Sequence, residues 1–279
     1  MKTLLFTLIT LLTMTTGTIA QEKTQGHYAA VNGLNMYYEI HGTGKPLVLI
    51  HGGGSTIYTT FGCVLPELAK HYKIIAVELQ AHGHTKDINR PVTFVQDADD
   101  VAALLQQLHI SKASVWGFSN GANTAMQMGI RHPELVDKLV LASGFYRRDG
   151  MQPWFWPMME KGTFADMPQL YKDAYLAITH DEAGLHAMYE HDSQRMLHFT
   201  DWPDDDLRAI KAPSLIIVGD QDVMTPEHAI AMHRLIANSK LAVLPGTHGE
   251  YMGEIMAAKK GDRMPQLVTA MVEAFLDGQ

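Results

Sequence analysis

GFSNG, at residues 117–121, is the stretch that decides the fold of this 279-residue chain. It follows a short apolar run, residues 113–116, and precedes a helix-like run from Ala122 to Ile130. This is the G-x-S-x-G pattern of a nucleophile elbow, in which a strand turns sharply into a helix. The turn holds the Ser119 hydroxyl clear of the backbone, and the glycines leave room where a Cβ would clash. The pattern therefore predicts Ser119 as a nucleophile.

A serine nucleophile needs a base, and the base needs a carboxylate that orients it. Downstream, the buried-strand pattern LIIVGDQD at residues 215–222 ends in two acids, Asp220 and Asp222. A second strand pattern at residues 241–244 leads into a loop that carries His248. The chain order serine, acid, histidine differs from the orders in chymotrypsin-like and subtilisin-like proteases.

An acyl-transfer site also needs N–H donors that face the developing oxyanion. The Asn120 N–H is one candidate, because it follows Ser119 and the helix that begins there has its positive dipole end at the same point. The second candidate is Gly53, in the HGGG loop (residues 51–54) after a strand pattern at residues 47–50. Glycine at this position lets the backbone approach a substrate.

With these motifs the chain resembles α/β-hydrolase-fold serine hydrolases, of the branch that holds small carboxylesterases, lactonases, cofactor-free perhydrolases and proline iminopeptidases. The resemblance runs from about residue 27 to the C-terminus and also includes AHGHT at residues 81–85. It implies that Asp222, rather than Asp220, completes a triad with Ser119 and His248. One departure is Glu78, which stands where the family usually has Asp and leaves the geometry of the next loop open.

Strand and helix patterns alternate along the chain, which predicts parallel strands joined by crossover helices. The resemblance implies the α/β class: a mostly parallel eight-stranded sheet, flanking helices and a small helical cap inserted after the sixth strand. Residues from about 146 to 210 break the alternation and are rich in aromatic residues and Met, so we expect them to form this cap. A single helix is expected over residues 59–71, and Cys63, the only cysteine, is expected in the core.

The first twenty residues have the pattern of a secretory signal peptide. Lys2 is basic, residues 4–12 form an apolar segment too short to span a bilayer, and cleavage is expected after Ala20. We therefore expect one hydrolase domain over residues 21–279, without stable membrane insertion, in the periplasm or outside the cell. The net charge of −8 and the lack of basic blocks argue against nucleic acid as a partner. The 15 histidines match no zinc spacing, so neither a metal nor a cofactor is expected.

These patterns predict an exported serine hydrolase that acts on carboxylic esters or lactones of small, mainly apolar molecules through an acyl-enzyme. One alternative is an aminopeptidase similar to proline iminopeptidase, which would need acids in the cap; Glu160, Glu182 and Glu190 are the candidates. Another is a non-catalytic binding protein on the same fold, although a pure binder has no need of His248. The acyl and alcohol groups and the oligomeric state are left open.

Overall fold

The computed structural model of the chain describes residues 26–278, so the predicted signal peptide lies outside the described part. An eight-stranded sheet with the order β1-β2-β4-β3-β5-β6-β7-β8 forms its centre. The strands are β1 (Gly26–Val31), β2 (Leu34–His41), β3 (Lys45–Ile50), β4 (Tyr72–Val77), β5 (Ala113–Phe118), β6 (Val136–Ala142), β7 (Ser214–Gly219) and β8 (Ser239–Leu244). β2 is antiparallel to both β1 and β4, and the other neighbours are parallel. The expected α/β fold with a mostly parallel sheet is confirmed.

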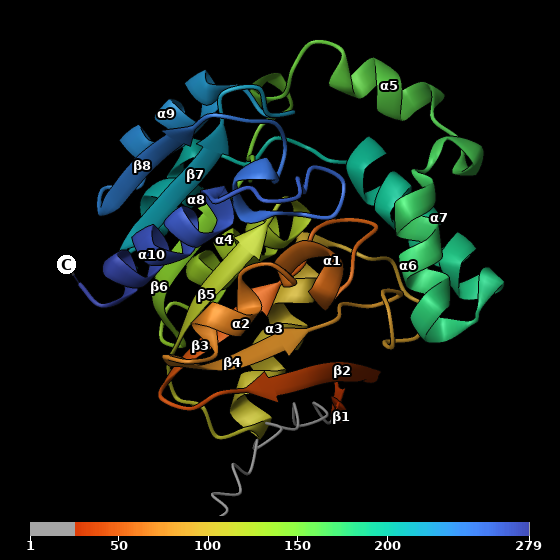
Figure 1. Cartoon of the computed structure of the whole chain (residues 1–279), viewed down its shortest axis with the longest axis horizontal. Helices are drawn as coiled ribbons and strands as arrows, with labels where there is room; N and C mark the ends of the chain where they lie inside the picture. The colour runs from red at the N-terminus through yellow and green to blue at the C-terminus, as the bar shows by residue number, and fades with distance from the viewer. Residues whose placement is uncertain (1–25, 279) are drawn as a thin grey trace, which may run out of the picture.

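Helices cover both faces of this sheet (Figure 1). The described residues form the helices α1 (Ile57–Phe61), α2 (Leu65–Leu68), α3 (Phe94–Gln107), α4 (Asn120–Arg131), α5 (Phe155–Lys161), α6 (Gln169–Thr179), α7 (Glu182–Leu197), α8 (Asp204–Ala209), α9 (Pro226–Leu235) and α10 (Met264–Leu276). Three short 3₁₀ turns lie at Arg148–Gly150, Phe164–Asp166 and Glu250–Met252. Helices α3, α4, α8 and α9 pack on one face, and α1, α2 and α10 pack on the other.

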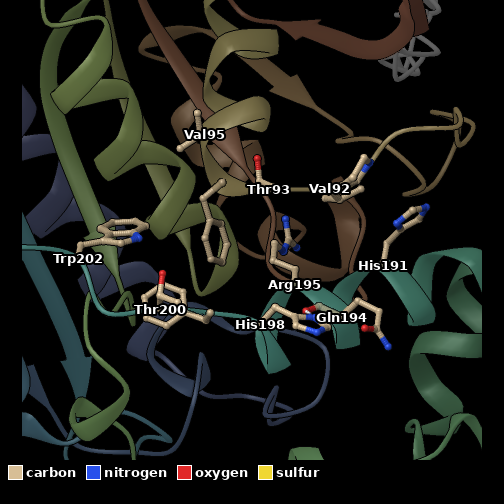
Figure 2. Close-up of a pocket in the computed structure, with 12 residues that line it drawn as sticks. Val92, Thr93, Val95, His191, Gln194, Arg195, His198, Thr200 and Trp202 are labelled. Atoms are coloured by element: carbon tan, nitrogen blue, oxygen red, sulfur yellow. Dashed lines mark hydrogen bonds between the residues drawn. The ribbon is translucent and has the colours of Figure 1, made fainter.

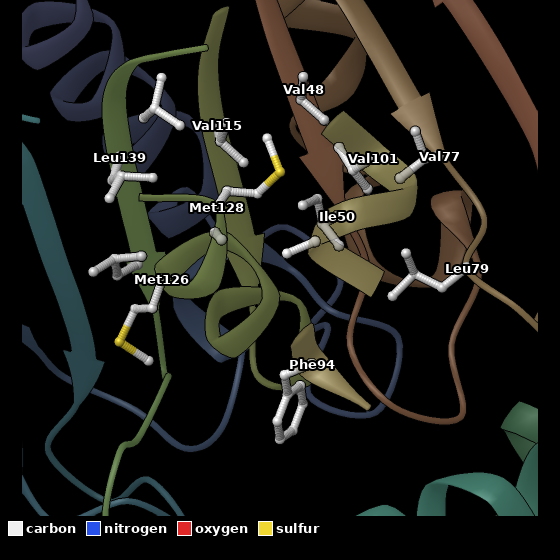
Figure 3. Packing of buried hydrophobic residues seen from close by; sticks show 14 of the residues in the cluster. Val48, Ile50, Val77, Leu79, Phe94, Val101, Val115, Met126, Met128 and Leu139 are labelled. Carbon is white, nitrogen blue, oxygen red and sulfur yellow. The ribbon is translucent and has the colours of Figure 1, made fainter. Parts of the chain in front are cut away.

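The strand sequences are continuously apolar because each central strand is buried on both faces. Along β3, Val48 and Ile50 join the core beneath α3 and α4, whereas Leu47 and Leu49 join the core on the opposite face. This alternation follows from the two-residue period of side chains in a strand. Figure 3 shows the first of these cores, in which Val48, Ile50, Val77 and Val115 of the sheet meet Val101, Met126 and Met128 of the helices.

Four helices, α5 to α8, separate β6 from β7, which confirms the expected helical insertion after the sixth strand. Helices α5, α6 and α7 stand to one side of the sheet, beyond the loops that follow its parallel strands (Figure 1). The carboxyl ends of those strands carry the predicted site residues, so the cap and the site face each other.

The helix expected over residues 59–71 is wrong as a single element, because α1 ends at Phe61 and α2 begins at Leu65. Pro66 explains the break, since a proline inside a continuous helix would lose its N–H bond and clash with the carbonyl of Gly62. Cys63 lies in this break and is exposed, so its expected place in the core is also wrong.

The two glycines of the elbow position the site because they let neighbouring backbone segments approach closely. A Cβ on Gly117 would lie 2.0 Å from the carbonyl oxygen of Gly121, and one on Gly121 would lie 2.1 Å from that of Ile50. Backbone on both sides leaves no flexible side chain to move aside, so only glycine fits at either position.

We therefore predict that Gly121→Ala lowers the free energy of unfolding by at least about 2 kcal/mol, because the added methyl overlaps β3. The control is Gly261→Ala, because an added Cβ there meets nothing within 4 Å and φ is +80°. This substitution should lower the free energy of unfolding only by the cost of placing alanine in a left-handed backbone conformation, roughly 1 kcal/mol. Denaturant unfolding measures both. Equal costs would contradict the close approach at Gly121.

Candidate active site

Ser119 sits between the last residue of β5 and the first residue of α4, at φ +53° and ψ −121°. Residues other than glycine rarely take a positive φ, so surrounding contacts must hold this turn. The Ser119 N–H donates to the Ala142 carbonyl at 2.8 Å, and the Ser119 carbonyl accepts from the Ala122 N–H at 2.8 Å. With its backbone fixed, the half-buried Ser119 side chain lines a cavity of about 380 Å³ beneath the cap.

The structure brings His248 to Asp222. Asp222, in the loop after β7, is almost fully buried, and its Oδ1 lies 2.6 Å from Nδ1 of His248. The same carboxylate accepts from the Val223 N–H at 2.7 Å, from the Gly219 N–H at 3.2 Å and from the Ser143 hydroxyl at 2.5 Å. Four donors therefore fix its position, and His248 keeps its Nε2 for another partner.

His248 also lies beside the elbow, since its ring is 4.7 Å from the ring of Phe118, the residue before Ser119. Within residues 26–278 no hydrogen bond joins the Ser119 hydroxyl to His248. Such contacts often tighten only when a substrate is bound. The three predicted residues thus meet at one edge of the sheet, two of them in direct contact.

The two partners change each other's pKa. Burial lowers the pKa of His248, but the Asp222 carboxylate and the nearby Glu254 together raise it by more, so that the net shift is upward. Burial raises the pKa of Asp222, yet His248 and the Ser143 hydroxyl outweigh burial and the net shift is downward. This pairing keeps Asp222 ionised and makes His248 more basic than a free imidazole.

Asp220 has a different place, as expected. It is exposed, and its Oδ1 accepts from the Gly246 N–H at 2.9 Å, so it braces the loop that leads to His248. Two further residues of the site, which no sequence motif predicts, are Ser143 and Tyr251; their hydroxyls lie 2.7 Å apart behind Asp222. Ser143 follows the last residue of β6, and this position at the carboxyl edge of the sheet is the signal that could have identified it.

Gly53 and Asn120 lie with Ser119 in the wall of the same cavity. Among the described residues neither backbone N–H has a hydrogen-bond partner, as expected for Asn120 at the first position of a helix. The neighbours of Gly53 are both engaged: the Gly52 N–H donates to Thr60 at 3.3 Å and the Gly54 N–H to Asp192 at 2.5 Å. Of these three glycine N–H groups, that of Gly53 is therefore the free donor.

Glu78 occupies the position at which the family usually has Asp, the shorter acid. Its side chain holds the next loop, whose geometry the sequence left open. Its carboxylate accepts from the His84 N–H at 2.6 Å and lies 2.9 Å from the His84 ring nitrogen Nδ1. A Cβ on Gly83 would lie 2.3 Å from this carboxyl group, and Gly83 has φ +52°. The longer acid thus closes the loop by packing against a glycine.

The cavity beside Ser119 has mainly apolar walls from the cap. These include Phe155, Met158, Met159, Met167, Tyr171 and Met196. The charged residues in its lining are both acids, Asp166 and Asp192, and no Lys, Arg or His is among them. Asp166 accepts from the Thr163 hydroxyl, and Asp192 is bonded on both oxygens.

The three acids proposed for an aminopeptidase lie elsewhere. Glu160 and Glu190 line a neighbouring cavity of about 610 Å³, and Glu182 is exposed at the start of α7. Residues 26–278 contain no group of three or more His, Cys, Asp or Glu side chains that could hold a metal ion. In the same part of the chain, no helix is both long and apolar enough to cross a membrane.

We predict that the His248 imidazole titrates above 6.5, its ordinary pKa, in NMR spectra assigned by comparison with His248→Gln. In Asp222→Asn the midpoint should fall, because burial still disfavours the charged ring while the compensating carboxylate is gone. Asp220→Asn is the matched control and should leave the midpoint in place. A midpoint that responds to Asp220 rather than Asp222 would reverse the assignment.

Comparisons with known proteins agree with this fold. The α/β hydrolase fold family matches residues 45–186, more than half of the chain. An uncharacterised protein of Mycobacterium tuberculosis is 33% identical over 116 residues, which cover 42% of this chain and only 34% of that protein. The 2-hydroxy-6-oxo-2,4-heptadienoate hydrolase of Pseudomonas putida is 28% identical over 243 residues, or 78% of this chain and 87% of that enzyme.

Among solved structures, a serine hydrolase involved in carbazole degradation superposes with a TM-score of 0.75 at 22% identity, over 92% of this chain and all of that one. This likeness concerns the fold. Taken together with the elbow, the sheet order and the helical insertion, the family match shows that the chain is a hydrolase of the α/β hydrolase fold family.

Proposed function

We propose that this hydrolase is an exported serine hydrolase that cleaves carboxylic esters or lactones of small, mainly apolar molecules. The observation that carries the proposal is the cavity beside Ser119, which combines apolar walls with acids and lacks basic side chains in its lining. Export rests on the sequence of residues 1–20 and predicts a mature chain that begins at Gln21.

The mechanism follows from the positions of five residues. His248 Nε2 takes the proton from the Ser119 hydroxyl as its oxygen attacks the ester carbonyl. Asp222, bonded to Nδ1, holds the imidazole tautomer and stabilises the imidazolium. The Gly53 and Asn120 N–H groups bind the tetrahedral oxyanion. His248 returns the proton to the leaving alcohol, and water then cleaves the acyl-enzyme by the same steps.

The charge of the cavity separates this proposal from carbon–carbon bond cleavage. The Pseudomonas putida relative acts on a heptadienoate, which carries a carboxylate. In the present cavity no basic side chain of the lining would bind an anionic substrate, whose carboxylate would lose water without gaining a partner. A neutral ester or lactone does not meet this obstacle, and the Met-rich wall suits apolar acyl groups of varied shape.

The same cavity disfavours an aminopeptidase. A free amino terminus needs an available buried carboxylate, but Asp192 already accepts from Gly54, His82 and Arg195. Asp166, the other acid of the lining, is exposed to solvent and accepts from the Thr163 N–H and hydroxyl. Glu160, Glu182 and Glu190 do not line the cavity. The ester and lactone proposal is therefore the one that the described residues support best.

The test compares kcat/KM for a neutral butyryl ester, a 2-hydroxy-6-oxo-dienoate and a prolyl anilide. We expect the ester to exceed both others by at least about 100-fold, because only the ester avoids an unpaired buried charge. Glu160→Gln and Glu190→Gln serve as controls and should leave this preference unchanged. A higher value for the dienoate would assign carbon–carbon cleavage, and a higher value for the anilide would assign a peptidase.

A further inference from the structure

Asp192, on the cap helix α7, makes a direct contact with the loop that carries Gly53. Its Oδ2 accepts from the Gly54 N–H at 2.5 Å, although the two residues are 138 positions apart. A Cβ on Gly53 would lie 3.2 Å from the same oxygen, so the carboxylate packs against the backbone beside the free Gly53 N–H. A side chain of the cap thus touches the loop at Gly54 and beside Gly53.

Two cations hold this carboxylate. His82 is fully buried, with Nε2 3.0 Å from Asp192 Oδ2 and Nδ1 2.9 Å from the Gln80 carbonyl. Both ring nitrogens face acceptors, so the ring must carry both protons. Burial lowers the pKa of His82, but Asp192 raises it by more. Burial raises the pKa of Asp192, but His82 and Arg195 together lower it well below its usual range.

The neighbouring histidine takes the neutral form. His51 lies with Nδ1 2.7 Å from the Gly52 carbonyl, and its Nε2 accepts from the Leu79 N–H at 3.1 Å. Burial, together with the charge on His82, lowers the pKa of His51 to about 3. This neutral ring fixes the start of the loop, at Gly52, and leaves Asp192 to fix its end, at Gly54.

Arg195 makes a second connection between α7 and the main domain, at α3 rather than at the oxyanion loop. It lies one turn after Asp192 on α7, bonds the Asp192 carboxylate, and donates to Asp97 of α3 at 2.7 Å. Its guanidinium also stacks over the Phe94 ring at 4.7 Å. Figure 2 shows Arg195 reaching from α7 toward Thr93, at the start of α3. The Arg195–Asp97 pair therefore attaches the cap without touching the oxyanion loop.

We infer that Asp192 is a positioning residue that orients the Gly53 N–H toward the oxyanion, so that the cap helix α7 sets the geometry of the oxyanion hole. The inference rests on the proposed function of the same site. An N–H that is misdirected loses more in the transition state, where the oxygen is charged, than in the ground state. Loss of the Asp192 contact should therefore reduce kcat more than it changes KM.

The test uses the full-length protein and a neutral butyryl ester. Asp192→Asn, and Asp192→Glu, which keeps the charge but moves it by one methylene, should each lower kcat by roughly 10- to 100-fold, with KM within about threefold. The affinity for a trifluoromethyl ketone analogue, which forms an oxyanion on Ser119, should fall by the same factor as kcat/KM. Asp97→Asn is the control: it should lower thermal stability and leave kcat within about threefold.

A loss confined to KM, or an equal loss of kcat in Asp97→Asn, would show that Asp192 only docks the cap and would overturn the inference. Should Asp192→Asn fail to fold, Asp192→Glu decides alone, because it retains the charge that His82 and Arg195 need. If the wild-type protein cleaves no ester, the proposed function fails instead. The Gly54 amide resonance then still tests the contact, and an unchanged shift in Asp192→Glu would contradict it.

Discussion

The backbone turn at Ser119 depends on close packing at the centre of the sheet. A residue at φ +53° is held only when its neighbours leave it no alternative, and here β5 lies between β3 and β6 while α4 begins at the next residue. Gly117 and Gly121 have no Cβ, and neighbouring backbone occupies the space that a Cβ would need, so these elements approach closely. This packing holds the turn in its strained conformation. The turn thus places the Ser119 hydroxyl at the edge of the sheet, where the other site residues converge.

Around this turn, one buried and one half-buried carboxylate carry out different tasks with the same chemistry. Asp222 pairs with His248, raises its pKa and leaves one nitrogen for the serine. Asp192 pairs with His82, which has both nitrogens engaged and so serves only as a fixed charge. The difference lies in the second nitrogen of each histidine. A free nitrogen allows proton transfer, whereas a nitrogen bonded to a carbonyl allows only orientation.

The features that the sequence could predict are those with local causes. The elbow, the alternating strands and helices, and the order Ser119, Asp222, His248 all depend on short patterns, and the fold followed from them. The prediction of a single helix over residues 59–71 is wrong because Pro66 interrupts it. Glu160, Glu182 and Glu190 were selected by charge type alone, and the direction in which a cap side chain points depends on tertiary packing.

Asp192 and Ser143 were not predicted, because their contacts join residues 138 and 79 positions apart and no motif marks either one. Their roles are defined by what the fold places beside them: a loop N–H for Asp192 and the Asp222 carboxylate for Ser143. Packing between the cap and the main domain therefore completes a site whose reactive groups are encoded locally.

The proposed function requires Ser119 to act as a nucleophile activated by His248. Its most direct test is labelling with a fluorophosphonate, followed by mass spectrometry of the peptides. We expect a single adduct on Ser119, which is lost in Ser119→Ala and forms at least about 1000-fold more slowly in His248→Gln. An adduct on another residue, or labelling of Ser119 at an unchanged rate without His248, would contradict it.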